Sequence, residues 1–136
     1  YTSVYGGTEK AAKMLAAELE KSGVKAALSD LARCDMAEAV EDAFRYGKLV
    51  LATTTYNNDI FPFMRTFIDG LLERNYQNRT IAFIENGTWA PTAAKVMRGM
   101  FEKSKNITFA ENGVRIMSAM NETNEKEIKL LAEELR

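Results

Sequence analysis

The chain has 136 residues, 46% hydrophobic and 27% charged, which is enough to form one domain with a buried core. Its net charge of −1, from basic and acidic residues mixed along the chain, gives no reason to expect nucleic acid as a partner. Histidine is absent and Cys34 is the single cysteine, which excludes a disulfide framework, a zinc site and histidine-based catalysis within these residues. No apolar run could cross a membrane and no signal peptide is visible, so we expect a cytoplasmic protein.

Helices and strands are predicted to alternate along the chain. Helices are indicated by apolar residues spaced three and four apart, and strands by short apolar runs that suit a sheet buried on both faces. The predicted order is helix Glu9–Lys21, strand Val24–Leu28, helix Asp35–Tyr46, strand Lys48–Thr53, a helix opened by Pro62, strand Thr80–Glu85, a helix opened by Pro91, an interrupted strand within Asn106–Met117, and helix Glu125–Leu135. This alternation predicts an α/β domain over residues 1–136, with a parallel sheet covered by helices on both faces.

Three polar segments follow predicted strands: Ser3–Thr8, Thr53–Asp59 and Glu85–Ala90. In parallel sheets of this kind, ligands bind beyond the carboxyl ends of the strands. We therefore expect the three segments to meet in one crevice.

The first segment reads SVYGGT and runs into a predicted helix. A helix start presents unpaired N–H groups and a positive dipole end, and Gly6 and Gly7 allow the backbone to curl around an anion. Hydroxyl groups of Ser3, Tyr5 and Thr8 add neutral donors, so the segment suits a terminal phosphate without a metal. A simple Ser- or Thr-capped helix is an equally good interpretation of this segment alone.

The second segment reads TTTYNND, from Thr53 to Asp59. Its threonines and asparagines are poor core residues but suit hydrogen bonds to a polyol or to the edge of a heterocycle. The alternative is a polar connection in which Asp59 caps the helix that Pro62 opens.

The third segment reads ENGTWAP and holds the single tryptophan, Trp89. An indole in a loop offers a flat face on which a planar ligand can stack. The alternative, which this loop taken by itself favours, is an indole that folds back over the helix beneath it. A phosphate cradle, polyol donors and a stacking platform together describe a site for FMN.

The same residues resemble a known family. The stretch SVYGGTE is similar to the phosphate loop of flavodoxins, and the tyrosine before its first glycine resembles the flavodoxin domain of flavodiiron proteins. The stretches TTTYNNDIFP and NGTWAP are similar to the second and third flavin loops of that family. The resemblance covers essentially the whole chain.

The resemblance implies a cofactor site made of residues from all three segments. The phosphate would be held by Ser3, Val4, Tyr5, Gly6, Gly7 and Thr8. The ribityl chain and ring edge would contact Thr54, Thr55, Tyr56, Asn57 and Asn58. The other side of the ring would be lined by Asn86, Gly87, Thr88 and Trp89.

The resemblance also implies a three-layer sandwich with a parallel five-stranded sheet in the order 2-1-3-4-5. Its first strand is cut short here, because Tyr1 and Thr2 alone precede the phosphate loop. An internal strand leaves its neighbours unpaired when it is missing, so we expect this sequence to be the carboxyl-terminal part of a longer chain.

By resemblance, the expected function is electron transfer by bound FMN to a di-iron domain that reduces oxygen or nitric oxide. The donor would be a rubredoxin or a reductase, and the question of a homo-oligomer stays open. The alternatives are a free-standing flavodoxin, a small NAD(P)H-dependent flavin or quinone reductase, and a flavodoxin-like interaction module without catalysis. No catalytic side chain and no metal ligand is assigned within this chain.

Overall fold

The computed structural model describes residues 1–3, 6–56, 59–87, 92–117 and 120–136. These residues form five helices and five strands. The helices are α1 (Gly7–Lys21), α2 (Met36–Arg45), α3 (Pro62–Glu73), α4 (Ala93–Met100) and α5 (Glu122–Leu135); the strands are β1 (Lys48–Tyr56), β2 (Asp59–Ile60), β3 (Arg79–Asn86), β4 (Ile107–Phe109) and β5 (Val114–Ile116).

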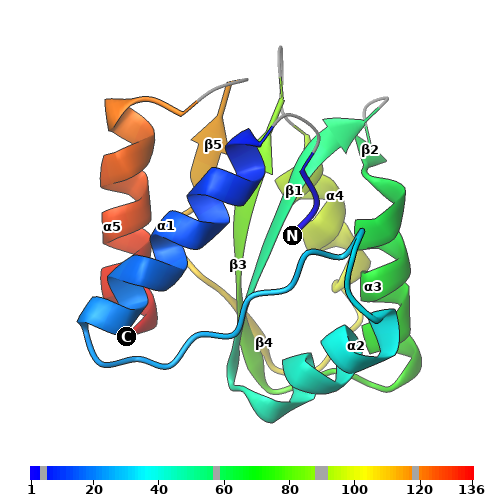
Figure 1. Ribbon diagram of the computed structural model, residues 1–136. Helices are drawn as coiled ribbons and strands as arrows, with labels where there is room; N and C mark the ends of the chain where they lie inside the picture. Colours follow the sequence, from blue (N-terminus) through cyan, green and yellow to red (C-terminus); the bar gives the residue numbers. More distant parts are fainter. Residues whose placement is uncertain (4–5, 57–58, 88–91, 118–119) are drawn as a thin grey trace.

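The sheet is parallel except at one short edge strand. The two long strands β1 and β3 pair in register from Lys48 opposite Thr80 to Thr54 opposite Asn86. On the far side of β3 the short strands β4 and β5 pair with its two ends. Strand β2 folds back antiparallel on the end of β1. Figure 1 shows α1 and α5 on one side of this sheet and α2, α3 and α4 on the other, which gives three layers.

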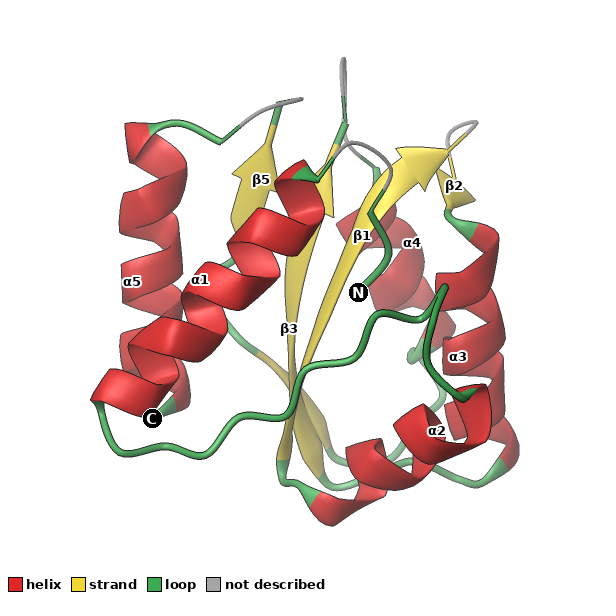
Figure 2. Cartoon of the chain, viewed as in Figure 1, coloured by secondary structure: helices red, strands yellow, loops and turns green. Residues whose placement is uncertain are grey.

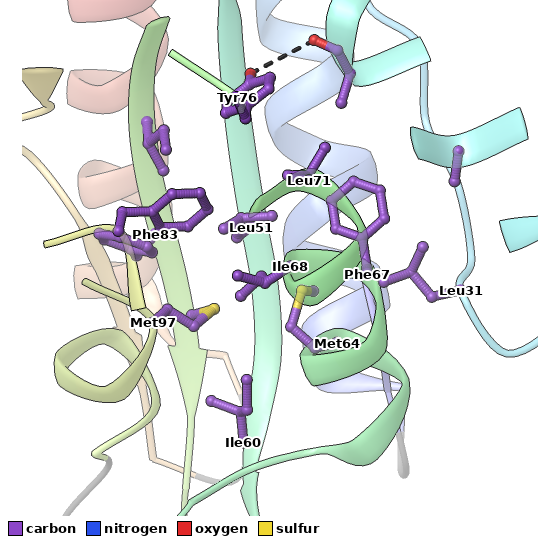
Figure 3. Close-up of a cluster of buried hydrophobic side chains, with 14 of the residues drawn as sticks. Leu31, Leu51, Ile60, Met64, Phe67, Ile68, Leu71, Tyr76, Phe83 and Met97 are labelled. Carbon is purple, nitrogen blue, oxygen red and sulfur yellow. Dashed lines mark hydrogen bonds between the residues drawn. The ribbon is translucent and has the colours of Figure 1, made fainter. Parts of the chain in front are cut away.

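The two cores of the domain come from opposite faces of the same strands. Successive strand residues point to opposite faces, so Leu51 and Phe83 pack under α2, α3 and α4, whereas Ala52 and Ile84 pack under α1 and α5. Figure 3 shows the first of these cores, in which side chains from α3 and α4 close over β1 and β3. Burial on both faces explains why β1 and β3 are continuous apolar runs.

Most predicted helices are confirmed, with shifts of a few residues at their ends. Asp35 lies just outside α2 and accepts a hydrogen bond from the amide of Ala37, as a helix N-cap does. Pro62 opens α3, as predicted. The prediction that Asp59 caps α3 is wrong, because Phe61 is the cap residue and Asp59 bonds to Ile60 and Arg65 instead.

The interrupted strand predicted within Asn106–Met117 is also confirmed. It forms β4 and β5, and residues 110–113 separate them without forming a strand. Strand β2 was not predicted, because two residues carry no periodicity.

The prediction of a strand at Val24–Leu28 is wrong, because these residues form no strand in the structure. They belong to the long connection between α1 and α2, which crosses in front of the sheet in Figure 2. A strand needs a hydrogen-bonded neighbour, and this segment instead faces β1 across a cavity.

Tyr1 and Thr2 lie where the shortened first strand was expected. The amide of Thr2 donates to the carbonyl of Ala52 in β1, and the carbonyl of Tyr1 accepts from the amide of Leu31. These two residues therefore lie between β1 and the connection after α1. This is the position that the predicted order 2-1-3-4-5, which counts the strand before the phosphate loop as its first, gives to that strand. Among the described residues, no helix has the length and apolar character that a membrane span requires.

Candidate functional site

The polar segments predicted to form a crevice lie at one edge of the sheet. Strands β1, β3 and β5 all end at the edge where α1 begins (Figure 1). Three contacts lie at this edge: Thr2 to Thr53, Thr8 to Thr54, and the amide of Thr92 to the hydroxyl of Thr55. The contact of Thr8 with Thr54 joins the first two predicted segments. For the described residues, the first two segments therefore meet as predicted, and the crevice formed by all three segments stays a prediction.

The first segment forms a tight turn into α1. Gly6 has φ +88°, a left-handed conformation that residues with a side chain rarely adopt, and a Cβ built there would meet no atom within 4 Å. The hydroxyl of Ser3 accepts hydrogen bonds from the amides of Gly6 (3.1 Å) and Glu9 (3.3 Å). No described residue accepts from the amides of Gly7 and Thr8. Within the described part of the chain, these two N–H groups at the positive end of α1 thus have the character of an anion site.

Ser3 has a double role in this arrangement. Its hydroxyl caps the turn, so the capped-helix interpretation holds for part of the segment. The same hydroxyl can still donate its own proton to a ligand, because both of its described bonds use it as an acceptor.

Threonine hydroxyls connect the first two segments. The Oγ1 atoms of Thr2 and Thr53 form a hydrogen bond in the interior, where both residues are almost fully buried. The Oγ1 atoms of Thr8 and Thr54 lie 3.4 Å apart, nearer to the crevice. The first contact ties the segments together, and the second is long enough for both hydroxyls to bond a ligand as well.

The third segment is held by the start of α4. Glu85 is buried at the end of β3, and its carboxylate accepts from the amide of Ala94 (3.3 Å) and lies 3.6 Å from the Nε of Arg115. The amide of Gly87 donates to the carbonyl of Ile116, which anchors β3 to β5 just before the crevice. The Oγ1 of Thr92 is buried and has no partner among the described residues.

The carboxylates of Asp59 and Glu9 near this edge have hydrogen-bond and ion-pair partners within the protein. The Asp59 carboxylate accepts from the Ile60 amide and from Arg65, and both bonds lower its pKa. Glu9 bonds Lys13 and the hydroxyl of Tyr1, and these bonds lower the pKa of its carboxyl group. Both carboxylates therefore stay ionised, and each is paired with a cation: Glu9 with Lys13, and Asp59 with Arg65.

The structure describes part of the predicted site. Side chains or backbone are described for Ser3, Gly6, Gly7, Thr8, Thr54, Thr55, Asn86 and Gly87, all of which lie at this edge. Tyr56 is described as the last residue of β1, without its side chain. Val4, Tyr5, Asn57, Asn58, Thr88 and Trp89 lie outside the described residues, as does Pro91, the predicted start of α4.

Three residues of the site were not predicted from sequence. Thr53 opens the second predicted segment without being assigned to the cofactor site, and no local signal shows that its hydroxyl meets that of Thr2. Thr92 could have been found, because a threonine after a proline that opens a helix occupies the N-terminal cap region, where hydroxyl groups are favoured.

Comparison with known proteins gives a family match. The flavodoxin family model matches residues 1–128. A search of curated proteins finds no match.

Solved structures superpose over almost the whole chain. Rubredoxin:oxygen oxidoreductase from Desulfovibrio gigas has a TM-score of 0.90 and 19% identity, over 98% of this chain and 33% of that one. A flavodoxin from Streptococcus pneumoniae has a TM-score of 0.80 and 19% identity, covering 98% of this chain and 92% of that one. A flavo di-iron protein variant from Thermotoga maritima has a TM-score of 0.78 and 22% identity, covering 99% and 33%. The chain therefore shares its fold with these proteins and spans about a third of the oxidoreductase.

Proposed function

Because the chain belongs to the flavodoxin family, we propose that it is a domain that binds FMN and transfers electrons. Family membership and fold support a flavin-type electron carrier. The identity of the flavin, the residues that hold it and the partners are our proposal.

The observation that carries the proposal is the start of α1. The amides of Gly7 and Thr8, which have no acceptor among the described residues, lie beside the left-handed turn at Gly6, and the hydroxyl of Thr54 approaches from the next segment. Backbone N–H groups at a helix start, with neutral hydroxyls beside them, bind a phosphate ester without a metal.

The described residues fit such a ligand in two further respects. The buried hydroxyl of Thr92, which has no partner among the described residues, would gain a hydrogen bond from a polar ligand at this edge. The carboxylates of Glu9 and Asp59 are paired with Lys13 and Arg65, and these cations reduce their repulsion of a phosphate at α1.

Each segment would make a different contact with FMN. Ser3, Gly7 and Thr8 would donate to the phosphate group. Thr54 and Thr55 would contact the ribityl chain, and Asn86 and Gly87 would line the ring. Bound FMN would supply the capacity to accept and release electrons, and the protein would bind it, orient it and exclude water from one side.

The test is a titration of the purified chain with FMN and with riboflavin, followed by flavin fluorescence. If the phosphate binds at α1, FMN should bind about a hundredfold more tightly than riboflavin, since several charge-assisted hydrogen bonds are added. Thr8→Val should weaken FMN binding about tenfold and leave riboflavin binding unchanged.

Thr108→Val is the matched control, because Thr108 lies on β4 at the opposite end of the sheet and is exposed. It should bind both flavins as the unaltered chain does. Equal affinity of the unaltered chain for FMN and riboflavin would contradict a phosphate site at α1.

We further propose that the electron partner is a di-iron domain, as in flavodiiron proteins. The support is the superposition on a third of the Desulfovibrio gigas oxidoreductase, whose name gives rubredoxin as its partner and oxygen as its substrate. Reduced rubredoxin should bleach the flavin absorbance of the FMN-loaded chain in a stopped-flow experiment, and the isolated chain should show almost no steady oxidation of NAD(P)H. Rapid NAD(P)H turnover would favour the reductase alternative.

A further inference from the structure

The tripeptide Glu-Asn-Gly occurs twice in the chain, at residues 85–87 and 111–113. The first copy lies at the end of β3, where Asn86 is buried in the sheet. The second copy lies in the link between β4 and β5, where Asn112 is half-buried and Gly113 is exposed. Because the two local sequences are identical, any difference in their chemistry is set by the structure.

An asparagine that precedes glycine can react with its own backbone, because glycine has no side chain to crowd the approach. The glycine nitrogen gives up its proton and attacks the side-chain Cγ of the asparagine. The new N–Cγ bond closes a cyclic imide, while the Cγ–Nδ2 bond breaks and Nδ2 takes up a proton and leaves as ammonia. Water then opens the imide to aspartate or isoaspartate. The reaction requires a glycine nitrogen that can lose its proton and turn toward the side chain.

The copy at the end of β3 does not meet this requirement. The amide of Gly87 donates to the carbonyl of Ile116 at 3.0 Å. Asn86 is 8% exposed and is held in register between Thr54 of β1 and Ile116 of β5. Reaction at Asn86 therefore needs a local opening of the sheet, and the free energy of that opening lowers the reactive fraction.

The copy in the link between β4 and β5 does meet it. No described residue accepts a hydrogen bond from the amide of Gly113, which is exposed to water and hydroxide. The side chain of Asn112 is held by a hydrogen bond from Nδ2 to Oε1 of Glu134, at 2.8 Å. This bond lies at the surface, where water readily replaces it, and it engages neither Cγ nor the nitrogen of Gly113.

We propose that Asn112 is a site of spontaneous deamidation, at which the nitrogen of Gly113 displaces ammonia, and that the sheet protects Asn86 from the same reaction. The only other reactant is water. This proposal does not depend on FMN binding.

Deamidation would change the contact between the link and α5. The Glu134 carboxylate accepts from the amides of Asn112 and Glu111, each at 2.9 Å, and from Nδ2 of Asn112. The two backbone bonds are the largest causes of its lowered pKa, so Glu134 is ionised at neutral pH. Conversion of Asn112 replaces the donor Nδ2 by a carboxylate oxygen, and two negative charges then face each other. Deamidation should therefore release the link from α5.

The experiment measures deamidation at the two asparagines in the same sample. The folded protein is incubated at mildly alkaline pH and digested with trypsin, which places Asn86 in the peptide 80–95 and Asn112 in the peptide 106–115. Mass spectrometry of both peptides should show deamidation about tenfold or more faster at Asn112 than at Asn86. In concentrated urea the two rates should become similar, because the local sequences match and the sheet no longer protects Asn86.

Gly113→Ala tests whether the nitrogen of Gly113 is the attacking group. A Cβ at this position would lie 3.5 Å from the carbonyl oxygen of Phe83, an ordinary contact, so the variant should fold. The added methyl group crowds the nitrogen, so deamidation at Asn112 should slow while the rate at Asn86 stays the same.

Asn112→Asp tests the consequence for the link. The amide of Glu111 should exchange its hydrogen about threefold faster in this variant, because the new charge repels Glu134. Adding Glu134→Gln should restore the slower exchange, since glutamine accepts from the same amides without a charge. Unchanged exchange in Asn112→Asp would contradict the release of the link from α5.

Three results would overturn the deamidation site itself. They are equal rates at Asn86 and Asn112 in the folded protein, a preference for Asn112 that persists undiminished in urea, and an unchanged rate at Asn112 in Gly113→Ala.

Discussion

The polar groups at the two ends of the sheet differ in whether they have hydrogen-bond partners within the protein. At the amino end of the strands, Arg79 donates to the carbonyls of Phe44, Tyr46 and Gln77, and the Tyr76 hydroxyl donates to the carbonyl of Ala43. At the carboxyl end, the amides of Gly7 and Thr8 and the hydroxyl of Thr92 have no partner among the described residues. Among the described residues, polar groups at the amino end are thus paired within the protein, whereas three at the carboxyl end are not.

The difference separates stability from binding within one domain. Arg79 closes the carboxyl end of α2, where carbonyl groups lack helical partners, so the amino end of the sheet is a structural junction. The carboxyl end retains unpaired groups at a positive helix terminus, which lowers its contribution to stability and suits it to an anion. Variants at the first end should therefore unfold the protein, and variants at the second should release the ligand.

The largest expected effect comes from Tyr76→Ala. Tyr76 is 1% exposed and packs its ring against Phe44 at 5.1 Å and Phe101 at 6.4 Å. Removing the ring leaves a cavity, and the free energy of unfolding should fall by about 3–5 kcal/mol. Urea unfolding measures this change. FMN affinity at low temperature should stay within about twofold, and a large loss of affinity in the folded variant would show that the two ends are coupled.

Arg79→Met should have the next largest effect. The substitution keeps an apolar stem but removes three hydrogen bonds to carbonyl groups, so the free energy of unfolding should fall by about 2 kcal/mol. Arg98→Met is the control, because Arg98 is exposed and contacts the ring of Phe109 instead. Equal losses in the two variants would mean that the carbonyl contacts of Arg79 add nothing.

Thr53→Val and Thr8→Val compare a stabilising threonine with a ligand-binding threonine at the same end of the sheet. Thr53 is fully buried at the carboxyl end, and valine would leave the hydroxyl of Thr2 without its partner. The free energy of unfolding should fall by about 1 kcal/mol, whereas Thr8→Val should change it by less than about 0.5 kcal/mol. Thermal unfolding of both variants without flavin gives the comparison, and the reverse ranking would contradict it.

The smallest effect is a change in alkaline stability at the amino end. Burial raises the pKa of the Tyr76 hydroxyl from 10.0 to about 12, so above pH 10 the unfolded chain releases a proton that the folded protein retains. This contribution is fully present below pH 10 and is lost as the pH rises through about 12. Tyr76→Phe should flatten the decline of stability measured by urea unfolding between pH 9 and 11, and an unchanged decline would contradict this contribution.

The fold could be predicted from sequence because its long elements carry clear periodicity. The buried strands β1 and β3 are apolar runs bounded by polar residues, and α3 and α5 have regular apolar faces. Val24–Leu28 has the composition of a strand, but pairing depends on a neighbour that no local pattern reveals.

The candidate site could be predicted in its location but only partly in its contacts. Segments after parallel strands meet for topological reasons, so Ser3, Thr8 and Thr54 were identified correctly as neighbours of one edge. The pairing of Thr2 with Thr53, and of Asp59 with Arg65, depends on side-chain directions that follow only from the packed structure.

The interruption between β4 and β5 has a practical consequence for protein engineering. Each short strand holds its own register on β3, and the amides of Glu111 and Asn112 in the link bond the carboxylate of Glu134 on α5. The length of this link is therefore not set by the sheet. A reporter peptide grafted between Asn112 and Gly113 should leave both registers intact, which offers a position for a label beside the domain without cutting either core.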